Sequence, residues 1–172
     1  MSRRDKTTNS IMNKVDNTSN IIKEISDNLV ENCCAELDTI MNELHNLLGS
    51  SEELPTDTIQ NYILYLANTL YFVGSAQEDL GIKEDTCKAI RQEVYSRARE
   101  EATGTVADKT AQAELIAQAE TMTLAIYSRA YKKVKLRMDA GYDMLNSLKK
   151  VMNKRITEME LSNSRYINKS EV

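Results

Sequence analysis

Residues that break helices or fill thick cores are scarce in this chain. Tryptophan is absent, phenylalanine and proline occur once each, and there are only five glycines. No run of alternating β-branched residues is present, so the sequence contains no sign of a sheet. The many Ala, Leu, Met, Glu and Lys residues lose little rotamer freedom in helices. We therefore expect an all-α fold: an elongated, coiled-coil-like bundle of long amphipathic helices that is oligomeric, because aromatics are too few for one thick core.

Side chains for covalent or metal chemistry are equally few. His45 is the only histidine, which excludes a histidine-based triad or a multi-histidine metal site. The cysteines Cys33, Cys34 and Cys87 are odd in number and two are adjacent, so they predict free thiols in a reduced, cytoplasmic setting. No phosphate-cradling glycine loop, G-x-S-x-G elbow or kinase signature occurs. We expect no enzyme activity, no cofactor and no metal.

Long apolar runs are missing as well. The longest, Tyr62 to Val73, is too short to span a bilayer and is interrupted by Asn68. The segment Met1–Asn20 is polar and lacks the apolar centre of a secretory signal. These features predict a protein with no membrane partner.

Two short turn-forming segments divide the chain. Gly49-Ser50-Ser51 and Thr103-Gly104-Thr105 separate three stretches with helical periodicity. Within the helical core we expect one helix over 58–102, with a kink or short break near Gly74 and Gly81, and one unbroken basic helix over 107–161. The expected parts are a flexible N-terminus at 1–9, an acidic amphipathic helix at 10–48, the helical core at 57–161 and a flexible tail at 162–172.

The apolar stripes of the first and last helices have the spacing of packing seams. Leu37 and Leu44 belong to the first stripe, and the last helix repeats apolar residues at intervals of three and four. We expect these stripes to hold copies of the chain together as a homo-oligomer. Asp57 followed by Gln60 predicts a capping box at the start of the second helix.

Positive charge is concentrated in the last helix. From Arg129 to Arg155, nine basic residues stand against Asp139 and Asp143, which gives net +7 in a chain of net −4. A basic helix on an acidic protein usually meets phosphates, an anionic membrane or an acidic helix. At 100° per residue, five cations lie near the side opposite the apolar stripe and are candidates for nucleic-acid binding: Arg129, Lys132, Lys133, Lys150 and Lys154.

The surroundings of these cations allow two interpretations. Tyr127 and Tyr131 lie among them and could stack on unpaired bases, or they could be ordinary packing residues. The segment Ile21–Glu53 carries net −7 and is a complement for the basic helix, and Lys135 stands four residues before Asp139, the spacing of a helical ion pair. Charge alone does not choose between a nucleic acid and the acidic helix.

The order of the helical patterns from Asn61 to Met159 resembles a known family. A tyrosine-rich apolar opening, Gln60-Asn61-Tyr62-Ile63-Leu64-Tyr65-Leu66, precedes a mixed-charge helix that ends in Tyr95-Ser96-Arg97-Ala98-Arg99. After a glycine-containing turn, Lys109-Thr110-Ala111-Gln112-Ala113-Glu114 leads into a long helix with Tyr127 and Leu145-x-x-Leu148-Lys149. In these features the chain resembles the phage recombination mediator family typified by UvsY of T-even phages.

That resemblance implies a function. Members of the family form homo-oligomeric rings, bind single-stranded DNA and load a recombinase onto strands covered by the single-strand-binding protein, without catalysis. The resemblance implies DNA contacts for Arg91, Arg97 and Arg99, whereas Glu100 and Glu101, which follow where the family is more basic, shift the expected contact toward the last helix.

The expected protein is thus a bacteriophage recombination mediator for DNA recombination and repair, in the cytoplasm of an infected cell. Its expected partners are single-stranded DNA, a recombinase, a single-strand-binding protein and further copies of itself. The alternative is a viral coiled-coil scaffolding or interaction protein that has no nucleic-acid role.

Overall fold

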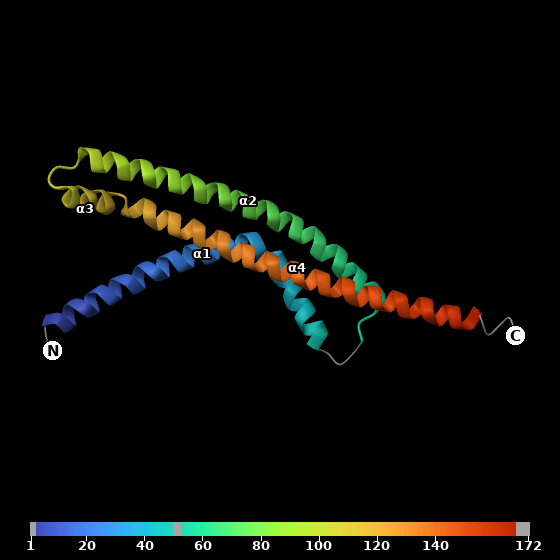
Figure 1. The fold of residues 1–172 in the computed structure, drawn as a ribbon. Coiled ribbons are helices and arrows are strands. Elements are labelled where there is room, and N and C mark those ends of the chain that lie inside the picture. Colours follow the sequence, from blue (N-terminus) through green and yellow to red (C-terminus); the bar gives the residue numbers. More distant parts are fainter. Residues whose placement is uncertain (1–2, 50–52, 168–172) are drawn as a thin grey trace. The chain divides into compact units, whose positions relative to one another are not determined.

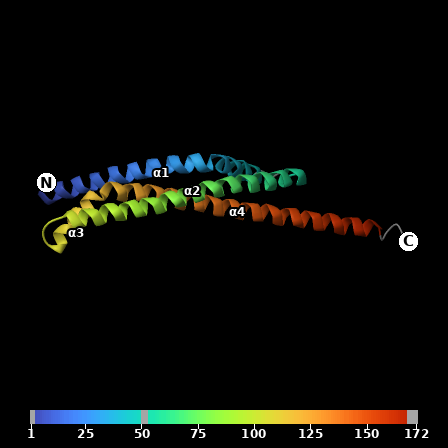
Figure 2. The same ribbon diagram turned by 90° about the horizontal axis from the view of Figure 1, so that it is seen from above.

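The computed structural model describes residues 3–49 and 53–167, and every element in these ranges is a helix (Figures 1 and 2). The elements are α1 (Arg3–Gly49), α2 (Thr56–Glu101), α3 (Val106–Ile116) and α4 (Gln118–Ile167). The all-α prediction is therefore confirmed. No helix in the described part of the chain has an apolar stretch long enough to cross a membrane.

The helix ends differ from the predicted ones. α1 begins at Arg3, inside the stretch 1–9 that was expected to be flexible, and α4 continues to Ile167, inside the expected tail. The predicted break near Gly74 and Gly81 is absent, because α2 runs through both glycines without interruption. At Gly81 the missing side chain makes room for a neighbour, because a Cβ there would lie 3.4 Å from Cε2 of Tyr131. Residues 1–2 and 168–172, the remainder of the two expected flexible ends, lie outside the described residues.

The prediction of one unbroken helix over 107–161 is wrong, because Ala117 separates α3 from α4. Its φ of −81° and ψ of 13° depart from helical values. α3 begins with a capping box: the Thr105 hydroxyl accepts from the Asp108 N–H, and the Asp108 carboxylate accepts from the Thr105 N–H. Gly104, at φ 110°, supplies the turn before it, and Figure 1 shows α3 returning beside the end of α2. Asp57 lies in the first turn of α2, where its negative charge interacts favourably with the positive end of the helix dipole.

The chain forms two compact units, each built from parts of several helices. Unit 1 comprises Met1–Cys33 and Ala76–Val134, and unit 2 comprises Cys34–Ser75 and Lys135–Val172. Unit 1 therefore contains the first part of α1, the second part of α2, all of α3 and the first part of α4. Unit 2 contains the end of α1, the first part of α2 and the rest of α4.

Large aliphatic side chains fill the core of unit 2. Leu37 and Leu44 of α1 are at most 1% exposed, so at these positions the predicted intermolecular stripe instead closes the core of a single chain. Gly141 of α4 meets this core, since a Cβ there would lie 2.8 Å from Cδ2 of Leu70. The last turns of α4 extend past the N-terminal end of α2 (Figure 2). The remaining core residues are Cys34, Ile40, Ile59, Leu66, Val73, Leu145 and Leu148.

Small side chains dominate the core of unit 1. Alanines let the end of α2, α3 and the first part of α4 pack closely: Ala98, Ala113, Ala117 and Ala130 are all buried. Val30, Leu80 and Val134 add the larger apolar groups. Because unit 1 buries little apolar volume, polar contacts contribute more to how its helices are positioned.

Candidate nucleic-acid interface

The nine basic residues from Arg129 to Arg155 of α4 fall into paired and unpaired groups. Three form ion pairs with acids outside α4, namely Lys133 with Asp27, Arg137 with Asp38 at 2.9 Å, and Arg155 with Glu53 at 3.0 Å. Lys154 lies 3.8 Å from Glu158, one turn further along α4. The other five are exposed and have no carboxylate within 4 Å among the described residues: Arg129, Lys132, Lys135, Lys149 and Lys150. These five are called the unpaired cations of α4.

Unit 1 holds Arg129 and Lys132 of this group. Lys133, next to Lys132 in the sequence, is already paired, because its ammonium donates a hydrogen bond to Asp27. That hydrogen bond lowers the pKa of the Asp27 carboxyl, and the positive charges of Lys133, Lys23 and Arg129 lower it further. Lys133, a predicted site residue, therefore fastens α4 to α1 in this structure.

Unit 2 holds Lys135, Lys149 and Lys150. From residue 135 to residue 155, six cations stand against two acids, which leaves this part of α4 at net +4. The expected pair of Lys135 with Asp139 does not form. Lys154, another predicted site residue, keeps a side chain that is 77% exposed beside its distant partner Glu158.

Among the described residues, the acids of unit 2 that lie outside α4 form no ion pair with these lysines; Asp38 and Glu53 pair with arginines instead. The Tyr62 hydroxyl donates to Glu43 at 3.2 Å, and burial, helped by this bond, raises the pKa of Tyr62. A hydrogen bond with Glu36 likewise raises the pKa of Tyr65. Two of the α1 carboxylates in this unit are thus hydrogen-bonded to tyrosines of α2 rather than paired with lysines of α4.

The exposed lysines of unit 2 form a row with a tyrosine. Lys135, Tyr142 and Lys149 are spaced by seven residues, which places them on one side of a helix over about 21 Å. Tyr142 is 45% exposed. Lys135 and Lys149 were not among the predicted contacts, and their seven-residue spacing to a tyrosine is the signal that would have found them.

The predicted stacking residues are less accessible. Tyr127 and Tyr131 are both half-buried in unit 1, and the ring of Tyr131 packs at Gly81 of α2. Tyr142 of unit 2 therefore presents more open ring surface than either of them.

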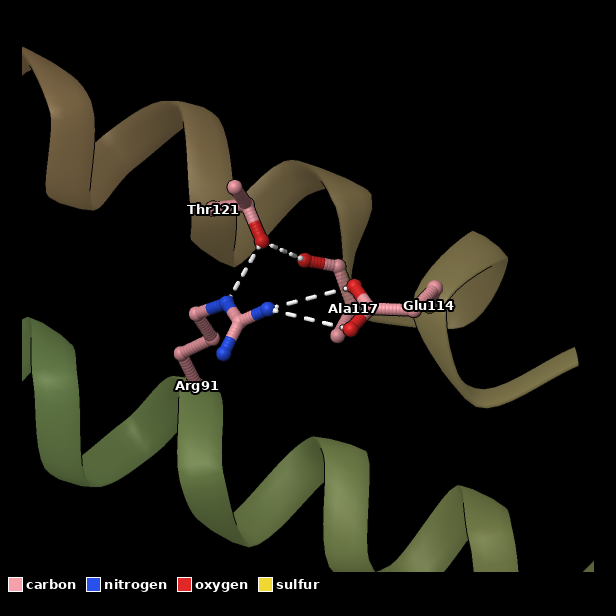
Figure 3. A network of polar contacts seen from close by, with 4 residues as sticks. All are labelled: Arg91, Glu114, Ala117 and Thr121. Atoms are coloured by element: carbon pink, nitrogen blue, oxygen red, sulfur yellow. Dashed lines mark hydrogen bonds and ion pairs between the residues drawn. The ribbon is translucent and has the colours of Figure 1, made fainter. Parts of the chain in front are cut away.

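Of the three arginines implied by the family resemblance, Arg91 is held most firmly (Figure 3). Its Nε donates to the Thr121 hydroxyl at 2.7 Å and its Nη2 donates to Glu114 at 3.1 Å. The ring of Tyr95 lies 5.9 Å from its guanidinium carbon. These contacts give Arg91 a structural role between α2, α3 and α4 within unit 1.

The other two arginines lie on the exposed side of α2. Arg97 pairs with Glu93 at 2.6 Å, one turn earlier in the helix. Arg99 is exposed and forms no ion pair with any described residue. Arg99 is thus the member of this trio with an unengaged charge.

No group of three or more His, Cys, Asp or Glu side chains is arranged to hold a metal ion within the described ranges. Comparisons of the chain with protein families, with curated proteins and with solved structures found no significant match. The binding surface is therefore inferred from the side chains themselves.

Proposed function

We propose that this protein binds single-stranded DNA through the unpaired cations of α4 and acts, without catalysis, as a recombination mediator that helps load a recombinase onto protein-covered DNA. The observation that carries the binding is that five of the nine cations at residues 129–155 of α4 stay exposed and unpaired although the chain as a whole is acidic. The mediator role, the recombinase and the single-strand-binding protein come from the family resemblance.

Phosphates are the partner that this arrangement fits best. Lysine and arginine contacts to a phosphate backbone release counterions and need no base sequence. In unit 2, an exposed tyrosine between two lysines adds a ring on which an unpaired base can stack, which favours a single strand over a duplex. Unit 1 offers its own smaller group, Arg129 and Lys132, with Arg99 also unpaired.

The proposal is tested by removing the charges of unit 2. The variant with Lys135→Gln, Lys149→Gln and Lys150→Gln should bind a fluorescent oligothymidine at least about tenfold more weakly than wild type at about 50 mM salt. A matched variant changes Lys14, Lys23 and Lys83, which are also exposed, to Gln and should bind like wild type. Equal losses in both variants would show a general charge effect and contradict this surface.

Substitution of Tyr142 tests the stacking contact. Tyr142→Leu should weaken single-strand binding by about 1–3 kcal/mol, whereas Tyr142→Phe keeps a ring and should bind normally. Binding to a duplex should differ little between the two variants, since paired bases cannot stack on the ring.

A scaffolding or interaction protein without a nucleic-acid role is the second candidate. It is favoured by the three ion pairs that join α4 to the acidic parts of the chain. If wild type ignores oligonucleotides at about 50 mM salt, this function replaces DNA binding.

A further inference from the structure

One side of α2 in unit 2 is apolar, uncharged and uncovered. From Thr58 to Gln77, twenty successive residues carry no charge, although charged residues make up 28% of the chain. One side of this stretch is buried in the core of unit 2 through Leu66, Leu70 and their neighbours. On the other side Leu64, Tyr71 and Phe72 are 63%, 73% and 59% exposed, and the last two rings meet edge to face at 5.4 Å.

We propose that this outward side of α2 binds the same side of a second copy of the chain, as an antiparallel helix pair centred on Asn68. The proposal goes beyond the proposed function and does not depend on DNA binding. Its interface consists of Asn61, Leu64, Asn68, Tyr71 and Phe72, with Ser75 at one edge and Tyr65, which hydrogen-bonds Glu36 of the same chain, at the other.

Charge identifies a second copy as the partner. In a two-fold contact each residue lies close to residues of the same patch, so a charged patch would repel itself. The outward side of α2 has no charge to repel over about 30 Å of helix. By contrast, Leu136 of α4 is equally exposed but stands between Lys135 and Arg137. Depletion of charge together with enrichment in aromatic residues is typical of the centre of protein interfaces.

The order of residues supports a two-fold axis at Asn68. In an antiparallel pair centred there, Leu64 lies opposite Phe72 of the second copy, and Tyr65 lies opposite Tyr71. Asn61 lies opposite Ser75, and the two Asn68 side chains meet at the axis. Apolar residues thus meet apolar residues and polar residues meet polar ones. A single amide pair within an apolar helix contact fixes its register.

The centre of the predicted apolar stripe of α1 cannot bind a second copy of the chain. Leu37 and Leu44 are already buried within unit 2 of one chain. The outward side of α2 is, by contrast, an apolar surface of unit 2 that a second copy can still cover.

Charge substitutions test both the partner and the register. Sedimentation velocity of the wild-type chain at micromolar concentration should show a dimer or a larger assembly. Leu64→Lys should raise the dissociation constant on the order of a hundredfold, because it places two cations in an apolar contact. Adding Phe72→Glu to that variant should restore assembly, since each introduced lysine then faces an introduced glutamate of the other copy. Leu136→Lys is the control and should assemble like wild type, and circular dichroism should show full helicity in all four proteins.

A disulfide across the axis gives an independent measurement. Asn68→Cys should yield a covalent dimer under mild oxidation, whereas wild type, with its three native cysteines, and Asn146→Cys on exposed α4 should not. A wild type that stays monomeric up to about 100 μM overturns the proposal. So does a wild type whose Leu64→Lys variant assembles normally, or a monomer that binds uncharged phosphatidylcholine vesicles through this side of α2.

Discussion

Gly141 shows how one missing methyl group lets α4 pack on the leucines of unit 2. A Cβ at this position would lie 2.8 Å from Cδ2 of Leu70 and 3.3 Å from Cδ1 of Leu37, both in buried side chains. We expect Gly141→Ala to lower the free energy of unfolding by about 1 kcal/mol in urea denaturation, because overpacking outweighs the gain in helix propensity.

Gly74 of α2 is the matched control for that substitution. Its Cβ would meet only Cε of Met138 at 3.8 Å, an ordinary contact with a flexible side chain. Gly74→Ala should therefore raise the free energy of unfolding by about 0.5–1 kcal/mol. Effects of the same sign in both variants would contradict this account of the packing.

Asp27 makes the stability of unit 1 depend on pH. The hydrogen bond from Lys133 is the main reason that its pKa lies below the ordinary value of 3.8. The folded chain therefore binds fewer protons here than the unfolded chain. The stabilisation is complete above the unfolded pKa and is lost as the pH falls through the folded one.

We expect Asp27→Asn to flatten the acid side of the stability curve. Between about pH 5 and about pH 2, the melting temperature of wild type should fall more steeply than that of the variant. Asp143→Asn, which changes an exposed carboxylate without an ion pair, should leave the slope as in wild type. Parallel curves for wild type and Asp27→Asn would show that the pair of Asp27 with Lys133 does not contribute to the pH dependence of stability.

At the scale of helices, Arg91 of α2 bonds to residues on both sides of the joint between α3 and α4. The Thr121 hydroxyl donates to the carbonyl of Ala117 at 2.8 Å and accepts from Arg91 (Figure 3). Hydroxyls that bond back to the preceding turn often bend a helix. Thr39 and Thr86 make the same backbone contact in unbroken helices. In the described chain, the bond from another helix is therefore what distinguishes Thr121.

We expect Arg91→Ala to loosen α3. Loss of the bonds to Glu114 and Thr121 should cost about 1 kcal/mol and increase amide hydrogen exchange over Val106–Ile116. Arg97→Ala is the control, since its exposed pair with Glu93 lies within α2 and contributes little. Unchanged exchange in α3 after Arg91→Ala would assign the joint to apolar packing alone.

This joint also marks the limit of what sequence predicts about the helices. The all-α class and most of the helix extents follow from periodicity and from the scarcity of breakers. The break at Ala117 does not, because alanine is the best helix former and because Arg91, which bonds to both sides of the break, lies 26 residues earlier in another helix. The turn before α3 was predictable from Gly104, whose φ is 110°.

The candidate nucleic-acid interface was also predictable only in part, because one of its predicted residues contacts a residue far away in the sequence. Helical geometry alone placed Arg129, Lys132 and Lys150 on the exposed side of α4, and they are exposed. It also placed Lys133 there, although this lysine reaches Asp27, which is 106 residues away in the chain. Pairing across such a distance depends on how helices pack, and the sequence pattern of one helix does not contain that information.

At the scale of the whole molecule, charge is distributed unevenly. The chain is net −4, yet residues 129–155 carry net +7. An acidic remainder repels a polyanion from other surfaces and directs it toward the cations that stay unpaired. The overall charge distribution and the unpaired cations therefore both favour α4 as the helix that binds DNA.

The salt dependence of DNA binding measures how many of these cations are used. Each phosphate contact to a single strand contributes about −0.7 to the slope of log affinity against log salt. If all five unpaired cations bind, the slope should be about −3.5, and with the three of unit 2 alone about −2. The variant with Lys135→Gln, Lys149→Gln and Lys150→Gln should lose about 2 from the slope of wild type. Because unfolding or loss of assembly would weaken binding without this defined change in slope, an unaltered slope in the variant would place the DNA on another surface.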